Sequence, residues 1–307
     1  MQQIPILNAN GKSLPRMAFG THSLKGQICR EMVGHAIDNG IRFLDTAAYY
    51  ENEEDVGQAI KSSSVSREEI IVGTKVWRKN ISREGIVESA EASLKRLGLD
   101  YIDVLYPHWH KASTSAEDMM AGFQTLIEAG KIRAVGMSNF NISMMEEVMA
   151  TGVQPVIANQ LEFHPYLGQR DLYEALRNHP AFRDYNLAVI AYSPLANGRV
   201  PKDQDLIEIG KKYGKSAAQT SLRWILQKDS TIALFRAQTL EELKEDMDIF
   251  DFNLSAEDMV KIDHMTLRQE RFYEHPSMRK KWDSAQGFAQ TGRPSPDMVR
   301  GVEEGPV

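Results

Sequence analysis

Short apolar runs alternate with amphipathic stretches along most of the chain, and this alternation constrains the fold more than any other feature. The runs recur roughly every 30 residues, as strands separated by helices do. The expected strands are 16–21, 41–47, 69–75, 101–108, 132–139, 155–160, 187–194 and 230–236, and the expected helices include 30–40, 82–97, 115–130, 142–151, 169–178 and 216–228. Strands joined through helices pair in parallel, because a parallel neighbour needs a long crossover connection.

Eight such units are the number that closes a parallel barrel, so the sequence predicts an α/β fold of the (β/α)8 TIM-barrel type. An open doubly wound sheet is the alternative, but no G-x-G-x-x-G motif follows the first expected strand. Residues 4–17 are expected to form an N-terminal β-hairpin with Asn10-Gly11 as its turn. We expect one domain over 1–307, with the barrel at about 16–263 and a polar, loop-like C-terminal tail at 264–307.

The composition narrows the classes of partner. A formal net charge of −6 offers no basic surface for nucleic acid. No run approaches the length of about 18 apolar residues that a membrane span requires, and the N-terminus lacks the apolar core of a signal peptide. Cys29 is the only cysteine, which excludes an intrachain disulfide and permits a reducing compartment. We therefore expect a soluble, cytoplasmic protein with no membrane partner.

Polar residues stand where several of the expected strands end. Asp45, Lys75 and His108 end the second, third and fourth strands, and Tyr50 follows Asp45 by five residues. Each alone has an ordinary structural explanation, such as a helix cap for the aspartate. Because all strand carboxyl ends of a parallel barrel share one face, we expect the four side chains to meet there. A lysine between an acid and a phenol is predicted to lower the pKa of the tyrosine, making it a usable acid or base near neutral pH.

Several long segments, in the same order, resemble the aldo-keto reductases over about residues 4–263. They are "AIDNGIRFLDTAAYYENEEDVG", "VGTKVW", "YIDVLYPHW", "GKIRAVGMSNF", "ANQLEFHPYL", "AYSPL" and "SAAQTSLRWILQ". The resemblance implies a nicotinamide-dependent reductase of aldehydes or ketones, or the reverse alcohol oxidation, by hydride transfer. It implies that Tyr50 donates the proton, Lys75 lowers the pKa of Tyr50, Asp45 pairs with Lys75, and His108 orients the carbonyl. Members of this family are often monomers, so we expect a monomer or weak oligomer.

The same resemblance implies residues for an NAD(P)(H) cofactor. Its carboxamide would be held by two polar strand ends and its ring would stack on an aromatic residue, here a phenylalanine where the family has tyrosine. The ribose would lie near a threonine, and the pyrophosphate would meet the turn after the seventh strand. The residues implied are Ser138, Asn139 and Gln160 for the carboxamide, Phe163 for the stack, Thr21 for the ribose, and Ser193 and Leu195 for the pyrophosphate. Alternatively, Ser138-Asn139 could cap the following helix.

The eighth strand and the helix after it depart from the family pattern. Where the family carries "IPKS" and then an arginine and an asparagine around the adenosine end, this chain reads "LFRAQTLEELKEDMD". Glu242 replaces the arginine, Asp246 the asparagine, and Arg236 the lysine. Carboxylates repel a 2′-phosphate and accept hydrogen bonds from a ribose diol, which favours NAD(H) over NADP(H). Arg236 argues the other way, because a guanidinium suits phosphate.

The expected substrate pocket is lined by His22, Trp77, Trp109 and His110, two of which are histidines where the family carries tryptophan and proline. A polar lining favours sugars or other small polar carbonyls. The alternative is that His22 and His110 simply face solvent. Phe272, Tyr273 and Trp282 of the tail are expected either to fold over the pocket or to pack on the outer helices.

Two other functions fit parts of the sequence. Some members of this fold family act as cofactor-sensing subunits of membrane proteins, and a sensor would bind cofactor without turnover. A metal-dependent hydrolase would use His108, His110 and Asp45 as ligands. Because Lys75 would then stand beside the cation, we expect no metal.

Overall fold

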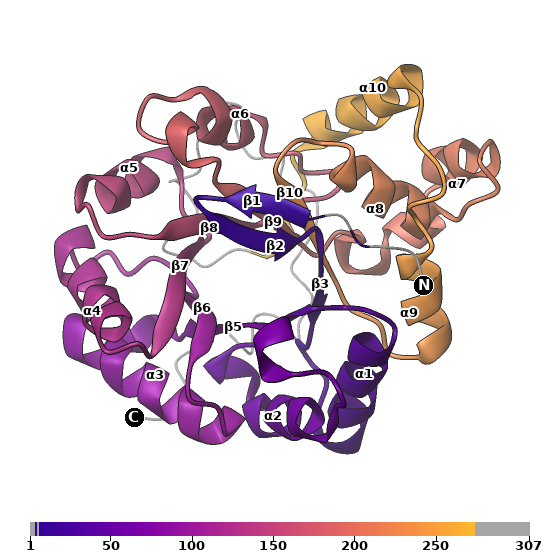
Figure 1. Cartoon of the computed structure of the whole chain (residues 1–307). Coiled ribbons are helices and arrows are strands. Elements are labelled where there is room, and N and C mark those ends of the chain that lie inside the picture. Colours follow the sequence, from indigo (N-terminus) through magenta and orange to yellow (C-terminus); the bar gives the residue numbers. More distant parts are fainter. Residues whose placement is uncertain (1–3, 5, 274–307) are drawn as a thin grey trace.

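The computed structural model describes residues 4 and 6–273, and its centre is a closed barrel of eight parallel strands (Figure 1). Around the barrel the strands follow the order β10-β3-β4-β5-β6-β7-β8-β9, so each unit pairs with the next and the last closes on the first. Their bounds are β3 Met17–Gly20, β4 Phe43–Asp45, β5 Ile71–Val76, β6 Ile102–Pro107, β7 Ile132–Ser138, β8 Val156–Glu162, β9 Ala188–Tyr192 and β10 Thr231–Phe235. The predicted (β/α)8 barrel is confirmed.

The helices form a ring outside the strands (Figure 1). They are α1 Gly26–Asp38, α2 Glu53–Ser62, α3 Arg83–Leu97, α4 Ala116–Glu128, α5 Ile142–Ala150, α6 Arg170–Asn178, α7 Gln204–Lys211, α8 Ala217–Leu226, α9 Leu240–Met247 and α10 Ala256–Met265. The short helices α2, α7, α9 and α10 lie outside the predicted ranges, because their charged sequences present only a narrow apolar face. The expected tail begins at residue 264, and its first residues complete α10 and form the 3₁₀ helix Thr266–Arg268. Trp282 lies outside the described residues.

A hairpin of β1 (Ile6–Ala9) and β2 (Lys12–Pro15) precedes the barrel, as predicted. Asn10 and Gly11 both adopt positive φ, 45° and 77°, which a two-residue turn of this hand requires. Ala9 and Leu14 pack into the apolar cluster of the barrel interior, and the hairpin lies across the barrel opening in Figure 1. The hairpin therefore covers the amino-terminal end of the strands, and the opposite end remains for chemistry.

Alternate residues of each strand face the barrel interior and the helices. Phe43, Tyr106 and Ile190 pack in the interior cluster, whereas Leu44 and Leu105 pack in the larger cluster under the helices. This alternation fixes the position of the polar strand ends, because a residue two places after an interior side chain points the same way. Within residues 4 and 6–273, no helix is both long and apolar enough to span a bilayer.

Candidate active site

An ion pair between Asp45 and Lys75 lies at the carboxyl ends of β4 and β5. Both side chains are almost fully buried, at 3% and 1% exposure. The ammonium of Lys75 also donates to the carbonyl of Thr46 at 2.8 Å, and the amide of Gln160 donates to the second carboxylate oxygen of Asp45 at 2.9 Å. Burial lowers the pKa of Lys75, and the neighbouring Asp45 carboxylate opposes this shift. Both charged groups of the pair are thus also hydrogen-bonded to other groups of the protein.

The phenol of Tyr50 lies beside this pair, at the end of the 3₁₀ helix Ala48–Tyr50. Its ring centre is 5.1 Å from Nζ of Lys75 and 5.6 Å from the ring centre of His108. The structure therefore brings Asp45, Lys75, Tyr50 and His108 together at one end of the barrel.

The expected lowering of the Tyr50 pKa is wrong in direction. Burial, and then the charge of Asp45, raise the pKa of Tyr50 well above its ordinary value. The Lys75 cation does not reverse this, because its charge is already balanced by Asp45 and a phenolate would be a second buried anion. The phenol of Tyr50 is consequently neutral in this site rather than ionised.

His108 completes the group as a neutral imidazole. Burial lowers its pKa well below the ordinary value, and the nearby positive charge of Lys75 adds to the effect. Within the described part of the chain, its buried Nδ1 atom has no hydrogen-bond partner. A buried ring nitrogen without a partner is costly in a finished structure and suits a site that binds a polar ligand.

Of the four expected pocket residues, two join this group. The ring of His22 lies 4.9 Å from that of Tyr50, and Trp77 lies edge-on to His108 at 5.3 Å. Trp77 is held in place by a stack on Tyr49 at 3.9 Å. Desolvation of the His22 ring lowers the pKa of this residue to about 4. Because His22 as a whole is exposed, solvent reduces the effect of this shift.

The other two expected pocket residues directly follow His108. The ring of His110 packs edge-on against Phe140 at 5.7 Å, and Trp109 is partly buried against the outer hydrophobic cluster. Among the residues that the structure describes, no three His, Cys, Asp or Glu side chains are grouped so as to hold a metal ion.

The expected carboxamide ligands lie next to the ion pair. Ser138 ends β7 and Asn139 follows it. Asn139 donates to Ser138 Oγ at 3.2 Å and to the carbonyl of His108 at 3.1 Å. Asn139 adopts a left-handed backbone with φ of 63°, which asparagine tolerates better than most residues. Gln160 lies on β8, and its side-chain amide donates to Asp45.

The expected stacking role of Phe163 is wrong. Its ring is fully buried under the helices, against Trp224 at 5.4 Å. The aromatic ring at the site is instead Tyr192, whose hydroxyl donates to Asn139 Oδ1 at 2.9 Å. Strand alternation could have identified it, because Tyr192 lies two residues after interior-facing Ile190, whereas Phe163 lies two after helix-facing Leu161.

The expected ribose and pyrophosphate residues border the same region. Thr21 is fully buried, and its hydroxyl donates to the carbonyl of Asp45 at 3.1 Å. Ser193 follows β9 with a positive φ of 51°, and its side chain lies close enough to the hydroxyl of Tyr273 to act on the pKa of that residue. Leu195 is partly buried and packs against the outer cluster, so its backbone is what remains for a ligand.

The charged residues expected at the adenosine end lie at β10 and α9. The guanidinium of Arg236 reaches across to Ser23 Oγ and the carbonyl of His22. Glu242 is exposed and accepts the backbone N–H of Gln238 at 2.7 Å, at the start of α9. Asp246 is buried, and burial with the nearby Glu242 and Glu245 charges raises its pKa to about 7.

This donor set fits a nicotinamide dinucleotide. Amide and hydroxyl groups of Ser138, Asn139 and Gln160 match a carboxamide, and the ring of Tyr192 offers a flat face beside them. The guanidinium of Arg236 and the hydroxyl of Ser193 are groups that suit phosphate. The buried Nδ1 of His108 has no partner among the described residues, as suits a site for a polar ligand.

Comparisons with known proteins point the same way. The sequence pattern described as "Aldo/keto reductase family" matches residues 16–266. The chain is 38% identical to glyoxal reductase of Bacillus subtilis (strain 168), over 87% of this chain and 94% of that protein. It is 37% identical to 2,5-diketo-D-gluconic acid reductase B of a Corynebacterium species, covering 84% and 91%. It resembles the structure of a Bombyx mori aldo-keto reductase in complex with NADP, with a TM-score of 0.80, 29% identity, and coverage of 91% and 98%.

Proposed function

The chain belongs to the aldo/keto reductase family, and we propose that it reduces a small polar aldehyde or ketone with Tyr50 as the proton donor. It is a nicotinamide-dependent oxidoreductase that acts on carbonyl groups. The observation that carries the proposal is the meeting of Asp45, Lys75, Tyr50 and His108 at the carboxyl end of the barrel.

Each of the four residues has a distinct part in this chemistry. When bound, the nicotinamide supplies the hydride that reaches the carbonyl carbon. Tyr50, neutral because it is buried, gives its hydroxyl proton to the carbonyl oxygen as negative charge grows there. Lys75 stabilises the phenolate that remains, and Asp45 keeps the ammonium in position. His108, as a neutral ring, orients the carbonyl oxygen by hydrogen bonding.

The cofactor would be held by residues on the neighbouring strands. Ser138, Asn139 and Gln160 are proposed to bind the carboxamide, and Tyr192 to lie against the ring. Gln160 would have to share or release its bond to Asp45 for this purpose. Thr21 and Ser193 border the path toward the ribose and the pyrophosphate.

The proposed substrate is a vicinal dicarbonyl or a sugar-like ketone. Two imidazoles, His22 and His108, flank the phenol of Tyr50, so a substrate with a second oxygen next to its carbonyl meets a second polar group. Similar proteins are named for glyoxal and 2,5-diketo-D-gluconic acid, both of which carry more than one carbonyl. Trp77 supplies an apolar wall on the same side.

The proposed cofactor preference is NAD(H). The exposed carboxylate of Glu242 would repel a 2′-phosphate and accept bonds from a ribose diol. Two similar structures, at 29% and 26% identity, are complexes with NADP and NADPH, and Arg236 would suit that phosphate. Comparison of kcat/KM with NADH and NADPH decides between them, and a clear NADPH advantage would overturn this preference.

Turnover tests the proposal as a whole. Reduced nicotinamide absorbance is followed while methylglyoxal, ketoses, aldoses and simple aldehydes are added with either cofactor. We expect oxidation of the cofactor, fastest with substrates that carry adjacent oxygens. Tight cofactor binding with negligible oxidation would indicate a sensor instead. The cytoplasmic location and the monomeric or weakly oligomeric state remain predictions.

A further inference from the structure

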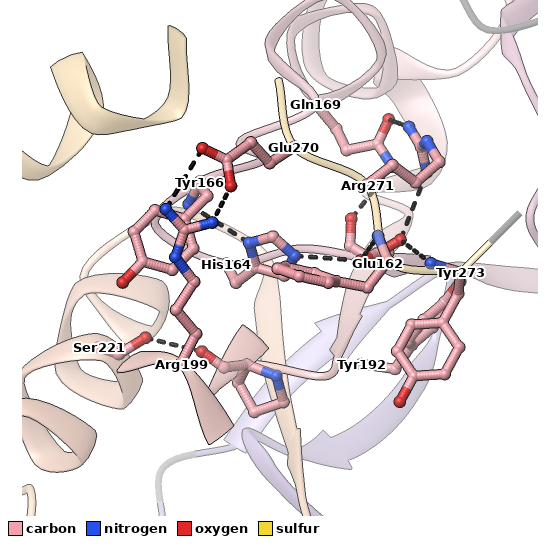
Figure 2. A network of polar contacts seen from close by, with 12 residues as sticks. Glu162, His164, Tyr166, Gln169, Tyr192, Arg199, Ser221, Glu270, Arg271 and Tyr273 are labelled. Carbon is pink, nitrogen blue, oxygen red and sulfur yellow. Dashed lines mark hydrogen bonds and ion pairs between the residues drawn. The ribbon is translucent and has the colours of Figure 1, made fainter. Parts of the chain in front are cut away.

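Glu162 is a buried carboxylate that plays no part in the proposed chemistry, and it binds the backbone of Phe272 and Tyr273. Glu162 and His164, at the end of β8 and just after it, are both fully buried, with His164 Nε2 3.1 Å from Glu162 Oε1. Glu162 accepts the backbone N–H of Phe272 at 2.7 Å and that of Tyr273 at 3.0 Å, one on each oxygen. Figure 2 shows this arrangement around Glu162.

Residues 270–273, which we call the strap, have further anchors on both sides of Glu162. Glu270 is ion-paired with Arg199, and its backbone N–H donates to the carbonyl of Tyr166 at 2.9 Å. Arg271 donates to Gln169 Oε1 at 3.1 Å, and Gln169 in turn donates to the carbonyl of Glu162 at 3.0 Å. The strap is thus fixed to the loops that follow β8 and β9 (Figure 2).

The strap carries Tyr273 to the part of the site assigned to the cofactor. The ring of Tyr273 lies edge-on to that of Tyr192, with centres 5.7 Å apart and planes at 85°. Its hydroxyl lies close enough to the side chain of Ser193 for that residue to lower its pKa, although burial is the larger effect and raises it. Both partners of Tyr273 are therefore residues that the cofactor would need, one for the nicotinamide ring and one for the pyrophosphate.

We propose that Tyr273 competes with the nicotinamide cofactor for Tyr192 and Ser193, and that Glu162 is the positioning residue that holds it there. The inference rests on the proposed function, because it takes these two residues as cofactor contacts. Cofactor binding then requires the phenol of Tyr273 to leave Ser193. By linkage, the contact weakens cofactor affinity by the same factor by which bound cofactor weakens the contact.

The affinity of the purified full chain for NADH and NADPH, measured by quenching of protein fluorescence, tests the competition. One polar contact and one aromatic contact are together worth about tenfold in an equilibrium constant. We expect Tyr273→Ala to lower the Kd by about this factor, and Tyr273→Phe to have a smaller effect, since it keeps the ring contact. Tyr185→Phe, on the hairpin side of the barrel, serves as control and should leave the Kd unchanged.

A double-mutant cycle tests the part of Glu162. Glu162→Gln removes one of the two acceptors for the strap and should also lower the Kd. In the Tyr273→Ala background the same change should have no further effect, because Glu162 acts only through Tyr273. A merely structural role of Glu162 would change the Kd equally in both backgrounds, or weaken binding, and would contradict its positioning role.

The outcomes separate the two proposals. If Tyr273→Ala binds cofactor as the wild type does or more weakly, the competition is refuted while the reductase assignment stands. If neither cofactor binds to the wild type or to any variant, the proposed function itself fails. Should Glu162→Gln not fold, which its thermal unfolding curve would reveal, Tyr273→Ala and Tyr273→Phe still decide the question.

Discussion

The ammonium nitrogen of Lys75 lies 5.1 Å from the centre of the Tyr50 ring, with its charge balanced by the buried carboxylate of Asp45. This relationship determines whether Tyr50 carries its proton before and after the reaction. Before reaction the phenol stays neutral, because burial and Asp45 raise its pKa. Once the proton has gone to a substrate oxygen, the phenolate is left beside a cation. The arrangement therefore keeps the proton on Tyr50 until negative charge grows on a substrate oxygen, as reduction of a carbonyl requires.

Removing the cation tests this reasoning. We expect Lys75→Met to lower kcat for carbonyl reduction by about 10²- to 10³-fold, because the phenolate left behind loses its nearest positive charge. Affinity for the cofactor should change much less, since Lys75 bonds Asp45 and Thr46. Steady-state rates and fluorescence titrations measure the two quantities. Lys79→Met, an exposed lysine just after β5, is the control. Equal losses in both variants would speak against the assigned role.

The ion pair should also matter for stability. Asp45→Asn is expected to lower the free energy of unfolding by roughly 3 kcal/mol, because it leaves the buried ammonium of Lys75 without a compensating charge. Urea unfolding measures this change. Glu257→Gln breaks the exposed pair with Lys261 and should change the unfolding midpoint little. An Asp45→Asn midpoint equal to that of the wild type would show that the buried pair is not held as described.

Asp246 predicts a particular dependence of stability on pH. Its pKa is raised from 3.8 to about 7, so between these values the folded state binds a proton that the unfolded state releases. The free energy of unfolding therefore falls as pH rises from about 4 to above 7. We expect Asp246→Asn to raise the free energy of unfolding at pH 8 by on the order of 2 kcal/mol and hardly at pH 4.

Unfolding curves at both pH values measure this effect. Asp38→Asn, at the exposed end of α1, provides a comparison without burial. A gain for Asp246→Asn that is the same at pH 4 and pH 8 would show that the carboxyl group does not carry a raised pKa.

Glu242 predicts how cofactor preference can be changed. Glu242→Arg replaces repulsion of a 2′-phosphate by attraction, and we expect the NADPH/NADH ratio of kcat/KM to rise by roughly tenfold or more. The neighbouring exposed Glu241→Arg alters net charge equally and should shift the ratio far less. Kinetics with both cofactors give the two ratios. If both variants shift the ratio alike, a general charge effect explains the result and Glu242 is not a local determinant.

Much of the fold followed from local patterns in the sequence. Periodic apolar runs predicted the barrel, and residues at strand ends such as Asp45, Lys75 and His108 could be placed on one face because all parallel strands end there. The stacking role that the resemblance implied for Phe163 is wrong because of strand alternation, which the resemblance does not express. The two residues lie on opposite sides of their strands, and only Tyr192 faces the interior.

Other features depend on quantities that a sequence does not display. The pKa of Tyr50 is set by how deeply the assembled barrel buries it, which no spacing of residues expresses. Glu162 meets Phe272 and Tyr273 from 110 and 111 residues away, so this contact exists only once the chain has folded. The short charged helices α7 and α9 are likewise stabilised mainly by packing on their neighbours, α7 on α8 and α9 on α8 and α1.

The most direct test of the central claim is the rate of carbonyl reduction by Tyr50→Phe, with Tyr49→Phe as the matched control. Stopped-flow absorbance of the reduced nicotinamide follows hydride transfer, and a parallel fluorescence titration gives the cofactor Kd. We expect Tyr50→Phe to be slower by about 10²- to 10⁴-fold with cofactor affinity preserved, because only the transferable proton is lost, and Tyr49→Phe to stay close to wild type. Hydride transfer at the wild-type rate in Tyr50→Phe would contradict the account.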